Sequence, residues 1–239
     1  MPLPLPPVAS VRDFYAFERH VQTCRAHRGL GMVPQWYEVP VFYFSNPVAI
    51  VGDGEPVWAP KGSEALDYEL ELACIIGEPA RDLPADDSAM GCVAGLTVMN
   101  DWSARDLQRA EMAVGLGPSK SKDFATSLGP HLVPFNELRD RYRDGRLHLE
   151  MTAKVNGKEY SRGNSGDMYW TWPQLLAHAS RDTELRPGDV IGSGTVGTGC
   201  ILELTPEAVG GWLAPGDVVE LTVERIGTLR NPVVERPKS

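Results

Sequence analysis

Glycine and proline divide this chain into many short apolar runs. The 24 glycines and 20 prolines fall between those runs along all 239 residues, and no low-complexity linker separates one part from another. Both residue types favour turns and interrupt helices, so this spacing is typical of a domain rich in short strands. We therefore predict one mixed α+β, β-rich domain over residues 1–239, with short peripheral helices. The prolines of residues 1–10 predict an extended N-terminal arm.

Local patterns predict the elements of this domain. Apolar runs and alternation of apolar with polar residues indicate strands, and Asn156-Gly157 suits the type I′ turn of a hairpin. Ser10 and Asp13 form a capping-box-like pattern that predicts a helix after them. Pro-Gly-Asp at residues 187–189 and 215–217 predicts two similar turns, each leading into a strand. The predicted strands are residues 39–51, 55–58, 66–76 and 91–100 and the hairpin 147–155 with 158–161, and the predicted helices are residues 14–28, 102–112 and 172–181.

Charge and cysteine usage narrow the class of protein. The formal net charge is −9 and the pI is about 5.1, which argues against a nucleic-acid partner or an anionic membrane surface. No segment has the ~18 uninterrupted apolar residues of a membrane span, and the proline-rich start lacks the features of a signal peptide. The scattered cysteines Cys24, Cys74, Cys92 and Cys200 predict reduced, mostly buried thiols in a cytoplasmic protein, with no indication of a zinc site.

The most distinctive polar pattern lies on a predicted strand. Asp67, Glu69 and Glu71 alternate with apolar residues, so they share one face of that strand. Carboxylates at this spacing repel one another unless they are solvated, protonated or bridged by a cation. Two interpretations stay open at this point: a solvated face of a surface strand, or a cation site.

Polar residues also follow other predicted strands. Asp101, Arg105 and Gln108 come directly after the buried run of residues 91–100, and functional groups often gather at such a place. Asp101 as the cap of the next helix is the alternative. Lys122 lies in a loop, where a lysine is usually a solvated charge. The Gly-rich residues 192–199 lack the order of a nucleotide-binding loop, so we expect their backbone to approach a ligand closely.

His20 is the histidine with a suggestive partner. It lies seven residues after Asp13. On one helix the two side chains would share a face. The pattern is compatible with a catalytic pair or with two ordinary helix residues.

Together these motifs resemble those of the fumarylacetoacetate hydrolases. The resemblance covers residues 12–223, and the motifs stand in the family's order. The motifs are Asp13-Phe-Tyr-Ala-Phe-Glu-Arg-His20, Asp67-Tyr-Glu-Leu-Glu-Leu-Ala73, Met99-Asn-Asp-Trp-Ser-Ala-Arg-Asp106, Lys122-Asp-Phe-Ala-Thr-Ser-Leu-Gly-Pro130, Gly194-Thr195 and Ile201-Leu-Glu-Leu204.

The resemblance implies a fold and a set of site residues. The implied fold is a mixed β-sheet roll or sandwich of the type of that family's C-terminal catalytic domain. The implied metal is Mg²⁺, with Ca²⁺ or Mn²⁺ as alternatives, because hard oxygen ligands suit all three. The implied metal ligands are Asp13, Glu69, Glu71 and Asp101; the implied catalytic residues are His20, Glu203, Lys122, Gln108 and Arg105; and the implied substrate contacts are Tyr15, Tyr43, Thr195 and Arg28.

The same resemblance implies an activity. We expect a hydrolase that cleaves a C–C bond in a β-diketo acid of the fumarylacetoacetate, fumarylpyruvate or acylpyruvate type, in aromatic catabolism. Water would be activated by His20 with Glu203, and the leaving group would be a metal-held enolate. A keto-acid decarboxylase or isomerase of the oxaloacetate or 2-hydroxyhepta-2,4-diene-1,7-dioate type is the alternative. A non-catalytic metal-binding domain is a second one. The resemblance also implies a homodimer.

Three departures from the family pattern bear on the substrate. The chain starts where the family's catalytic domain starts, so we expect no counterpart of the N-terminal domain of the animal tyrosine-degrading enzyme. Met112 stands where that enzyme has a substrate-binding tyrosine. The segment after His20 is shorter, so the matching substrate arginine is either Arg25 or Arg28.

Overall fold

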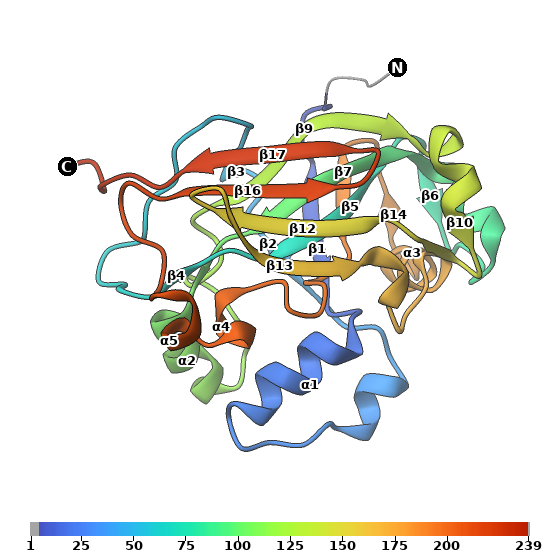
Figure 1. Cartoon of the computed structure of the whole chain (residues 1–239). Coiled ribbons are helices and arrows are strands. Elements are labelled where there is room, and N and C mark those ends of the chain that lie inside the picture. The colour runs from blue at the N-terminus through green and yellow to red at the C-terminus, as the bar shows by residue number, and fades with distance from the viewer. Residues whose placement is uncertain (1–4, 239) are drawn as a thin grey trace.

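Two β-sheets form the centre of the molecule. The computed structural model describes residues 5–238, and Figure 1 shows the two sheets stacked, with most helices on one side of them. The larger sheet has seven strands in the order β2-β1-β15-β5-β7-β9-β3 and mixes parallel with antiparallel pairs, whereas the smaller has four strands in the order β13-β12-β16-β17. The predicted strand-rich α+β class is confirmed.

The bounds of these elements are as follows. The strands are β1 (Ser10–Phe14), β2 (Phe42–Ser45), β3 (Ile50–Val51), β4 (Leu66–Asp67), β5 (Leu70–Ile76), β6 (Ala80–Arg81), β7 (Val93–Asp101), β8 (Ser103–Ala104), β9 (Thr126–Pro134), β10 (Tyr142–Arg143), β11 (Arg146–Leu147), β12 (Glu150–Val155), β13 (Lys158–Asn164), β14 (Glu184–Leu185), β15 (Asp189–Gly192), β16 (Val218–Val223) and β17 (Gly227–Pro232). The helices are α1 (Glu18–Ala26), α2 (Arg105–Val114), α3 (Trp172–Ser180), α4 (Ile201–Leu204) and α5 (Pro206–Val209), with short 3₁₀ helices η1 (Pro34–Tyr37), η2 (Asp87–Cys92), η3 (Phe135–Arg141) and η4 (Ser165–Asp167).

Strand β5 is buried on both faces because each face packs against a different layer. Leu70 and Leu72 belong to the core between the two sheets, where β12, β16 and β17 cover the larger sheet. Ala73 and Ile75 point to the opposite side and pack in a second cluster, against which Leu5 and Val8 of the N-terminal segment lie. A strand in this position needs an almost continuous apolar sequence.

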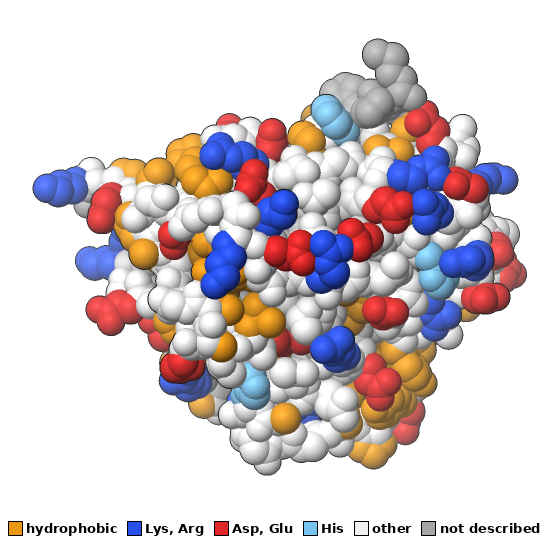
Figure 2. Space-filling model, in the orientation of Figure 1, with side chains coloured by type: hydrophobic (Ala, Val, Ile, Leu, Met, Phe, Trp, Pro, Cys, Tyr) orange, Lys and Arg blue, Asp and Glu red, His pale blue; other side chains and the backbone are white. Residues whose placement is uncertain are grey.

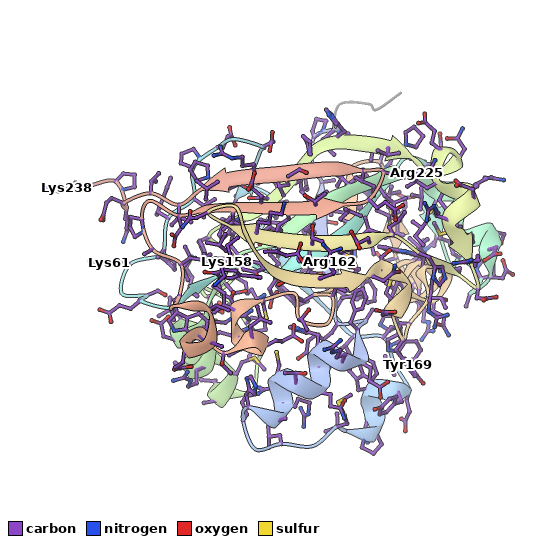
Figure 3. The ribbon with its side chains drawn as sticks, in the orientation of Figure 1. Lys61, Lys158, Arg162, Tyr169, Arg225 and Lys238 are labelled. Carbon is purple, nitrogen blue, oxygen red and sulfur yellow. The ribbon has the colours of Figure 1, made fainter. Side chains whose placement is uncertain are left out.

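The outer face of the four-stranded sheet carries mixed charge. Lys158 and Arg162 lie on β13 (Figure 3), and Arg162 forms ion pairs with Glu150 and Glu159. Figure 2 shows acidic and basic side chains side by side over this face. Exposed pairs of this kind contribute little to stability, so we assign this face to solvent rather than to a site.

Several predicted elements are confirmed. Residues 91–100 correspond to β7, residues 172–181 to α3, and the hairpin of β12 and β13 turns at Asn156 (φ 52°) and Gly157 (φ 76°). The two Pro-Gly-Asp turns are alike, because the Asp189 and Asp217 carboxylates each accept a hydrogen bond from the backbone N–H three residues earlier, both at 2.8 Å.

The predicted helix over residues 14–28 is wrong at its start. Residues Ser10–Phe14 form β1, which pairs with β15 on one side and β2 on the other, and the helix begins only at Glu18. Ser10 does not cap a helix, because its hydroxyl donates to Asp189 at 2.6 Å. Pairing on both edges satisfies the backbone of β1, and tertiary contacts of this kind override a local capping signal.

Other predicted boundaries also change. Residues 39–51 divide into β2 and β3, because Asn46 and Pro47 begin a turn in which the Asn46 side chain accepts the Val48 N–H at 3.2 Å. Residues 55–58 form no strand, only an isolated bridge from Val57 to Val233. Residues 66–76 separate into β4 and β5, and the helix expected at 102–112 begins at Arg105.

The arm predicted for residues 1–10 lies partly outside the described residues. Residues 5–9 have no regular secondary structure, and Ser10 already belongs to β1. The division of the chain into one domain stays a prediction. Among the residues that the structure describes, none of the helices has the length and apolar character needed to cross a bilayer.

Candidate active site

Neighbouring strands of the larger sheet bring four carboxylates together. Asp13 lies on β1, Glu71 on β5, Asp101 at the end of β7, and Glu69 directly before β5. One carboxylate oxygen from each lies within 4.8 Å of those of the other three, and all four side chains are buried. The residues implied as metal ligands, distant in sequence, therefore form a single cluster.

Each carboxylate in this cluster is held by a protein donor. The Tyr43 hydroxyl donates to Asp101 Oδ2 at 2.5 Å, and the Thr195 hydroxyl donates to Glu71 Oε1 at 3.2 Å. The second oxygens, Asp101 Oδ1 and Glu71 Oε2, are buried and have no hydrogen-bond partner. Buried polar atoms of native proteins are rarely without a partner, so these two oxygens indicate a missing ligand.

The electrostatics of the cluster point to the same missing ligand. Burial and the neighbouring carboxylates raise the pKa of Asp13 and of Glu71 well above the usual range, and burial is the main cause that raises the pKa of Asp101 to about 6. Burial also disfavours the ionised form of Glu69, but Lys122 and Arg105 outweigh it and lower the pKa of this carboxyl. A divalent cation would offset the negative charge that Lys122 and Arg105 leave uncompensated in this cluster.

The donor set therefore fits the metal that the sequence implies. Four carboxylates offer only hard oxygen ligands, which suit Mg²⁺, Mn²⁺ or Ca²⁺. Asp13, Glu69, Glu71 and Asp101 would hold the ion. The alternative that Asp67, Glu69 and Glu71 form a solvated strand face is wrong, since all three are buried.

Two buried cationic side chains flank the carboxylates. Lys122 contacts both Glu69 and Asp101 through its Nζ atom, and Arg105 donates to Glu69 Oε1 at 2.8 Å. Arg105 also donates from Nη1 to the Gln108 side-chain oxygen at 2.9 Å. The interpretation of Lys122 as a solvated loop charge is wrong, because its side chain is only 5% exposed.

Asp67 orients Arg105 but does not belong to the carboxylate cluster. Its carboxylate accepts Arg105 Nε at 2.8 Å and the backbone N–H groups of Ile201 and Leu202, at the start of α4. Asp101 does not cap α2, whose N-cap is Ala104 without a side-chain hydrogen bond. Asp67, the last residue of β4, therefore ties α2 and α4 to the segment that leads through Glu69 into β5.

His20 pairs with Glu203 at the edge of the same region. His20 Nδ1 lies 2.8 Å from Glu203 Oε2, and the backbone N–H groups of Thr198 and Gly199 each donate to this carboxylate at 3.0 Å. Burial lowers the pKa of His20, but the charge and hydrogen bond of Glu203 outweigh it and raise that pKa well above its usual value. The predicted shared helical face with Asp13 is wrong, because Asp13 lies on β1 and His20 on α1.

A cavity of about 820 Å³ joins these groups. Its lining contains three of the four implied metal ligands, Asp13, Glu69 and Glu71. His20, Lys122, Arg105 and Gln108 also line it. The implied substrate contacts also line it: Tyr15, Tyr43, Thr195 and Arg28. Glu203 is absent from the lining, so it stands behind His20 rather than beside a substrate.

Four further basic side chains line the cavity. Arg25 and Arg28 both line it, so the choice between them stays open. His27 and Arg109 line it as well, and the sequence analysis did not single out either residue. Arg109 lies four residues after Arg105 on α2, and this helical spacing could have indicated it. Met112 lines the cavity where the family pattern has a tyrosine.

The Gly-rich segment packs closely against β1 and the residues that follow it. A Cβ atom at Gly192 would lie 2.4 Å from Asp13 Oδ1, and one at Gly194 would lie 2.4 Å from the Phe14 carbonyl oxygen. The Gly194 N–H donates to Asp13 Oδ1 at 3.3 Å. These glycines therefore allow β15 and the following loop to press against the metal-site carboxylate.

Replacing Gly192 with alanine should displace the Asp13 carboxylate. We expect Mg²⁺ or Mn²⁺ affinity to fall about 10- to 100-fold, the range typical of residues that orient a metal ligand. Isothermal titration calorimetry would measure it. Gly91→Ala is the matched control, because nothing lies within 4 Å of a Cβ at that position. Unchanged affinity in Gly192→Ala would contradict the role assigned to this contact.

Comparison with known proteins agrees with the family resemblance seen in the sequence motifs. Residues 9–234 match the family model described as fumarylacetoacetate (FAA) hydrolase C-terminal. The chain belongs to the fumarylacetoacetate hydrolase family. The implied family membership and the family's fold are thereby confirmed, and its members differ in reaction.

Relatives within the fumarylacetoacetate hydrolase family carry different activities. The chain is 32% identical to the fumarylacetoacetase of Arabidopsis thaliana over 83% of its own length and 58% of that protein. It is 34% identical to the oxaloacetate tautomerase YisK of Bacillus subtilis over 82% of its own length and 62% of that protein. The chain thus spans about 60% of these two curated relatives.

A solved structure of the same fold matches nearly end to end. It is the fumarylpyruvate hydrolase of Pseudomonas aeruginosa in complex with Mn²⁺ and pyruvate. The TM-score is 0.78 at 24% identity, with 98% of this chain and 97% of that chain covered. At this level of identity the likeness establishes the fold.

Proposed function

We propose that this chain is a divalent-metal-dependent hydrolase that cleaves a C–C bond in a β-diketo acid. The observation that carries the proposal is the buried His20–Glu203 pair on the same cavity as the carboxylate cluster. A decarboxylase that only binds a metal and polarises a carbonyl does not need a carboxylate-backed imidazole, so the pair favours hydrolysis over decarboxylation. Hydrolysis does need one, because water must lose a proton as it attacks carbon.

The cluster would hold Mg²⁺, Mn²⁺ or Ca²⁺. When bound, such a cation supplies Lewis-acid stabilisation of the negative charge that develops on the two dicarbonyl oxygens. Asp13, Glu69, Glu71 and Asp101 are the proposed ligands. The solved Pseudomonas aeruginosa hydrolase of the same fold also contains a divalent cation, Mn²⁺.

The chain's own residues divide the remaining tasks. Glu203 holds His20 through Nδ1, which leaves Nε2 to accept a proton from water. Arg105, Gln108 and Lys122 stand near the carboxylates and donate to the oxyanion formed by that attack; losing one such donor typically costs ~10²–10³ in rate. The T-shaped contact of Tyr15 with the His20 ring, at 5.5 Å between centroids, keeps the imidazole in place.

Basic side chains in the cavity support an acidic substrate. Arg25, Arg28, His27 and Arg109 all line it. Guanidinium groups bind carboxylates in bidentate fashion, so a carboxylate remote from the reacting carbon would dock there. Fumarylpyruvate, fumarylacetoacetate and acylpyruvates are the substrates to test first, and we propose a place for the reaction in aromatic catabolism.

A tautomerase is the second candidate. The 34% identity to the Bacillus subtilis oxaloacetate tautomerase favours it. The same His20–Glu203 pair could move a proton between carbon and oxygen without adding water. NMR analysis of products from the Mg²⁺-loaded protein separates the two reactions: hydrolysis yields two fragments, whereas tautomerisation keeps the carbon skeleton intact. An intact skeleton for every diketo acid would contradict the hydrolase proposal.

The pH dependence tests the role of Glu203. A base must be neutral, so kcat/KM should rise with pH through the raised pKa of His20, above the ordinary value of 6.5. Glu203→Gln removes the negative charge that raises this pKa, so the rising limb should move to lower pH by about one unit or more. A pH–rate profile of both proteins measures the shift. An unmoved limb would exclude His20 as the group that titrates.

We also propose that the chain forms a homodimer. Phe44, Val48, Val114 and Leu116 are large apolar side chains that stand 64–92% exposed. Large contiguous patches of exposed apolar residues often mark contact surfaces, and these residues form two pairs that are each close in sequence. Multi-angle light scattering should give twice the chain mass of 26.2 kDa. A monomer at micromolar concentration would contradict the proposal.

A further inference from the structure

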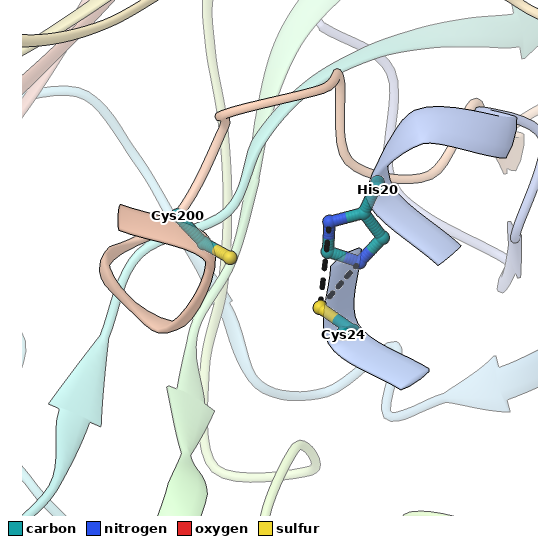
Figure 4. Close-up of side chains that lie close together, drawn as sticks. All are labelled: His20, Cys24 and Cys200. Carbon is teal, nitrogen blue, oxygen red and sulfur yellow. Dashed lines mark hydrogen bonds between the residues drawn. The ribbon is translucent and has the colours of Figure 1, made fainter. Parts of the chain in front are cut away.

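Two of the four cysteines meet beside the proposed base. Cys24 lies one helical turn after His20 on α1, and Cys200 lies directly before α4 (Figure 4). The thiols and the imidazole are all buried, and their donor atoms lie within 4.8 Å of one another. The scattered spacing of the cysteines in the sequence gave no indication of this cluster.

The distances in this cluster match those of a soft or borderline metal site. Cys24 Sγ lies 3.8 Å from both ring nitrogens of His20. Zinc bonds of about 2.0–2.1 Å to nitrogen and about 2.3 Å to sulfur place neighbouring ligand atoms of a tetrahedral ion about 3.5–3.8 Å apart. Cys24 and His20 therefore already stand close to the separation that a shared ion requires, and the three donor atoms lie within 4.8 Å of one another.

Glu203 supplies the support that such a site requires. Its carboxylate lies 2.8 Å from His20 Nδ1 and 3.6 Å from Cys200 Sγ. A histidine that ligates zinc through one nitrogen usually bonds a carboxylate through the other, which fixes the ring. Nε2 is then the nitrogen left for a metal. His20 and Cys24 also line the cavity, which gives an ion a route of entry.

We propose that His20, Cys24 and Cys200 form a second metal site that binds Zn²⁺ and takes the catalytic imidazole out of use. Binding releases both thiol protons to solvent, together with any proton on His20 Nε2, while Nδ1–H stays bonded to Glu203, and the zinc oxidation state does not change. The two metal sites differ in chemistry, because thiolates and imidazole select Zn²⁺, whereas carboxylates suit Mg²⁺. Inhibition by zinc rests on the proposed function, while the binding itself does not.

X-ray absorption spectroscopy tests the site in the unaltered protein. The reduced protein is saturated with Mg²⁺ and then given one equivalent of Zn²⁺. We expect the zinc edge to report two sulfur ligands at about 2.3 Å and at least one nitrogen at about 2.0–2.1 Å. A shell of oxygen and nitrogen alone would overturn the proposal.

Cysteine variants assign the sulfur ligands. Cd²⁺ added to the Mg²⁺-loaded protein should give a thiolate-to-cadmium charge-transfer absorption that saturates at one equivalent. The double variant Cys24→Ser/Cys200→Ser should lose this absorption. The matched control Cys92→Ser should keep it, because the Cys92 thiol donates to the Ala89 carbonyl oxygen instead. Absorption that survives in the double variant, or disappears in the control, would overturn the assignment.

Zinc inhibition separates this proposal from the proposed function. We expect Mg²⁺-dependent turnover of an acylpyruvate to be inhibited by Zn²⁺, and the inhibitory concentration to rise at least tenfold in Cys24→Ser/Cys200→Ser, each protein being compared with its own zinc-free rate. Sulfur-bound zinc without inhibition would keep the site and overturn the role of His20 as base. An oxygen and nitrogen shell, in a protein that still requires His20, would overturn the zinc site alone.

Discussion

Replacing His20 with alanine is expected to abolish turnover of acylpyruvates and fumarylpyruvate while metal binding survives. General bases typically contribute 10²–10⁴-fold, and we expect a loss in kcat of roughly this size. The metal should still bind because His20 belongs to α1 and contacts none of the four carboxylates by a hydrogen bond. Turnover is measured from the absorbance of the enol, and Mg²⁺ or Mn²⁺ affinity by calorimetry.

The fold should tolerate this substitution. Glu203 keeps its hydrogen bonds from the Thr198 and Gly199 backbone, so its buried charge does not lose every partner. His131→Ala, at an exposed position, is the control and should retain full activity. Wild-type hydrolysis by His20→Ala would refute the assignment of the base, whereas loss of metal affinity would place His20 in the metal site.

Replacing Glu71 with glutamine should have opposite effects with and without metal. The pKa of Glu71 is raised by burial and by Asp13, which means that its ionised form is unfavourable in the metal-free fold. Glutamine keeps the shape and removes that charge, so in EDTA at neutral pH the variant should be at least as stable as wild type. With Mg²⁺ the variant should be less stable than wild type, because it lacks a metal ligand. It should also lose measurable turnover.

Differential scanning fluorimetry makes this comparison. A metal at 100 times its Kd stabilises the folded state by about 2.7 kcal/mol, and Glu71→Gln should lose most of that increment. The exposed Glu64→Gln is the matched control and should behave as wild type in both conditions. A wild-type metal increment in Glu71→Gln would remove this residue from the proposed ligand set.

The same carboxylates give the metal-free protein an unusual pH dependence. An acid whose pKa is raised by folding favours the folded state when protonated, so stability falls as pH rises from its unfolded value through its folded one. For Asp101 this window runs from 3.8 to about 6, and Asp13 and Glu71 extend it upward. Glu69, with a lowered pKa, acts in the opposite direction. Saturating Mg²⁺ should remove most of this loss of stability. Melting temperatures measured across this pH range, with and without Mg²⁺, would test it.

The sequence by itself determined the strand-rich class and several strong elements. The apolar run of residues 91–100 indicated a buried strand, which is β7. Asn156-Gly157 indicated the hairpin turn, because few other residue pairs accept two positive φ angles. The motifs around Glu69, Asp101 and Lys122 also indicated the family and its metal-site carboxylates. Such signals are local, so they can be recognised before the fold is known.

The tertiary structure decided what local patterns could not. The pattern at Ser10 and Asp13 predicts a helix cap, yet pairing with β2 and β15 makes this segment a strand. The spacing of Asp67 and Glu69 also suited a solvated face, and only the burial of these two side chains beside Arg105 and Lys122 excludes that interpretation. The spacing of the cysteines in the sequence did not indicate that Cys24 and Cys200 lie close together. Contacts between residues far apart in sequence are set by packing of whole sheets and helices, which a local pattern does not encode.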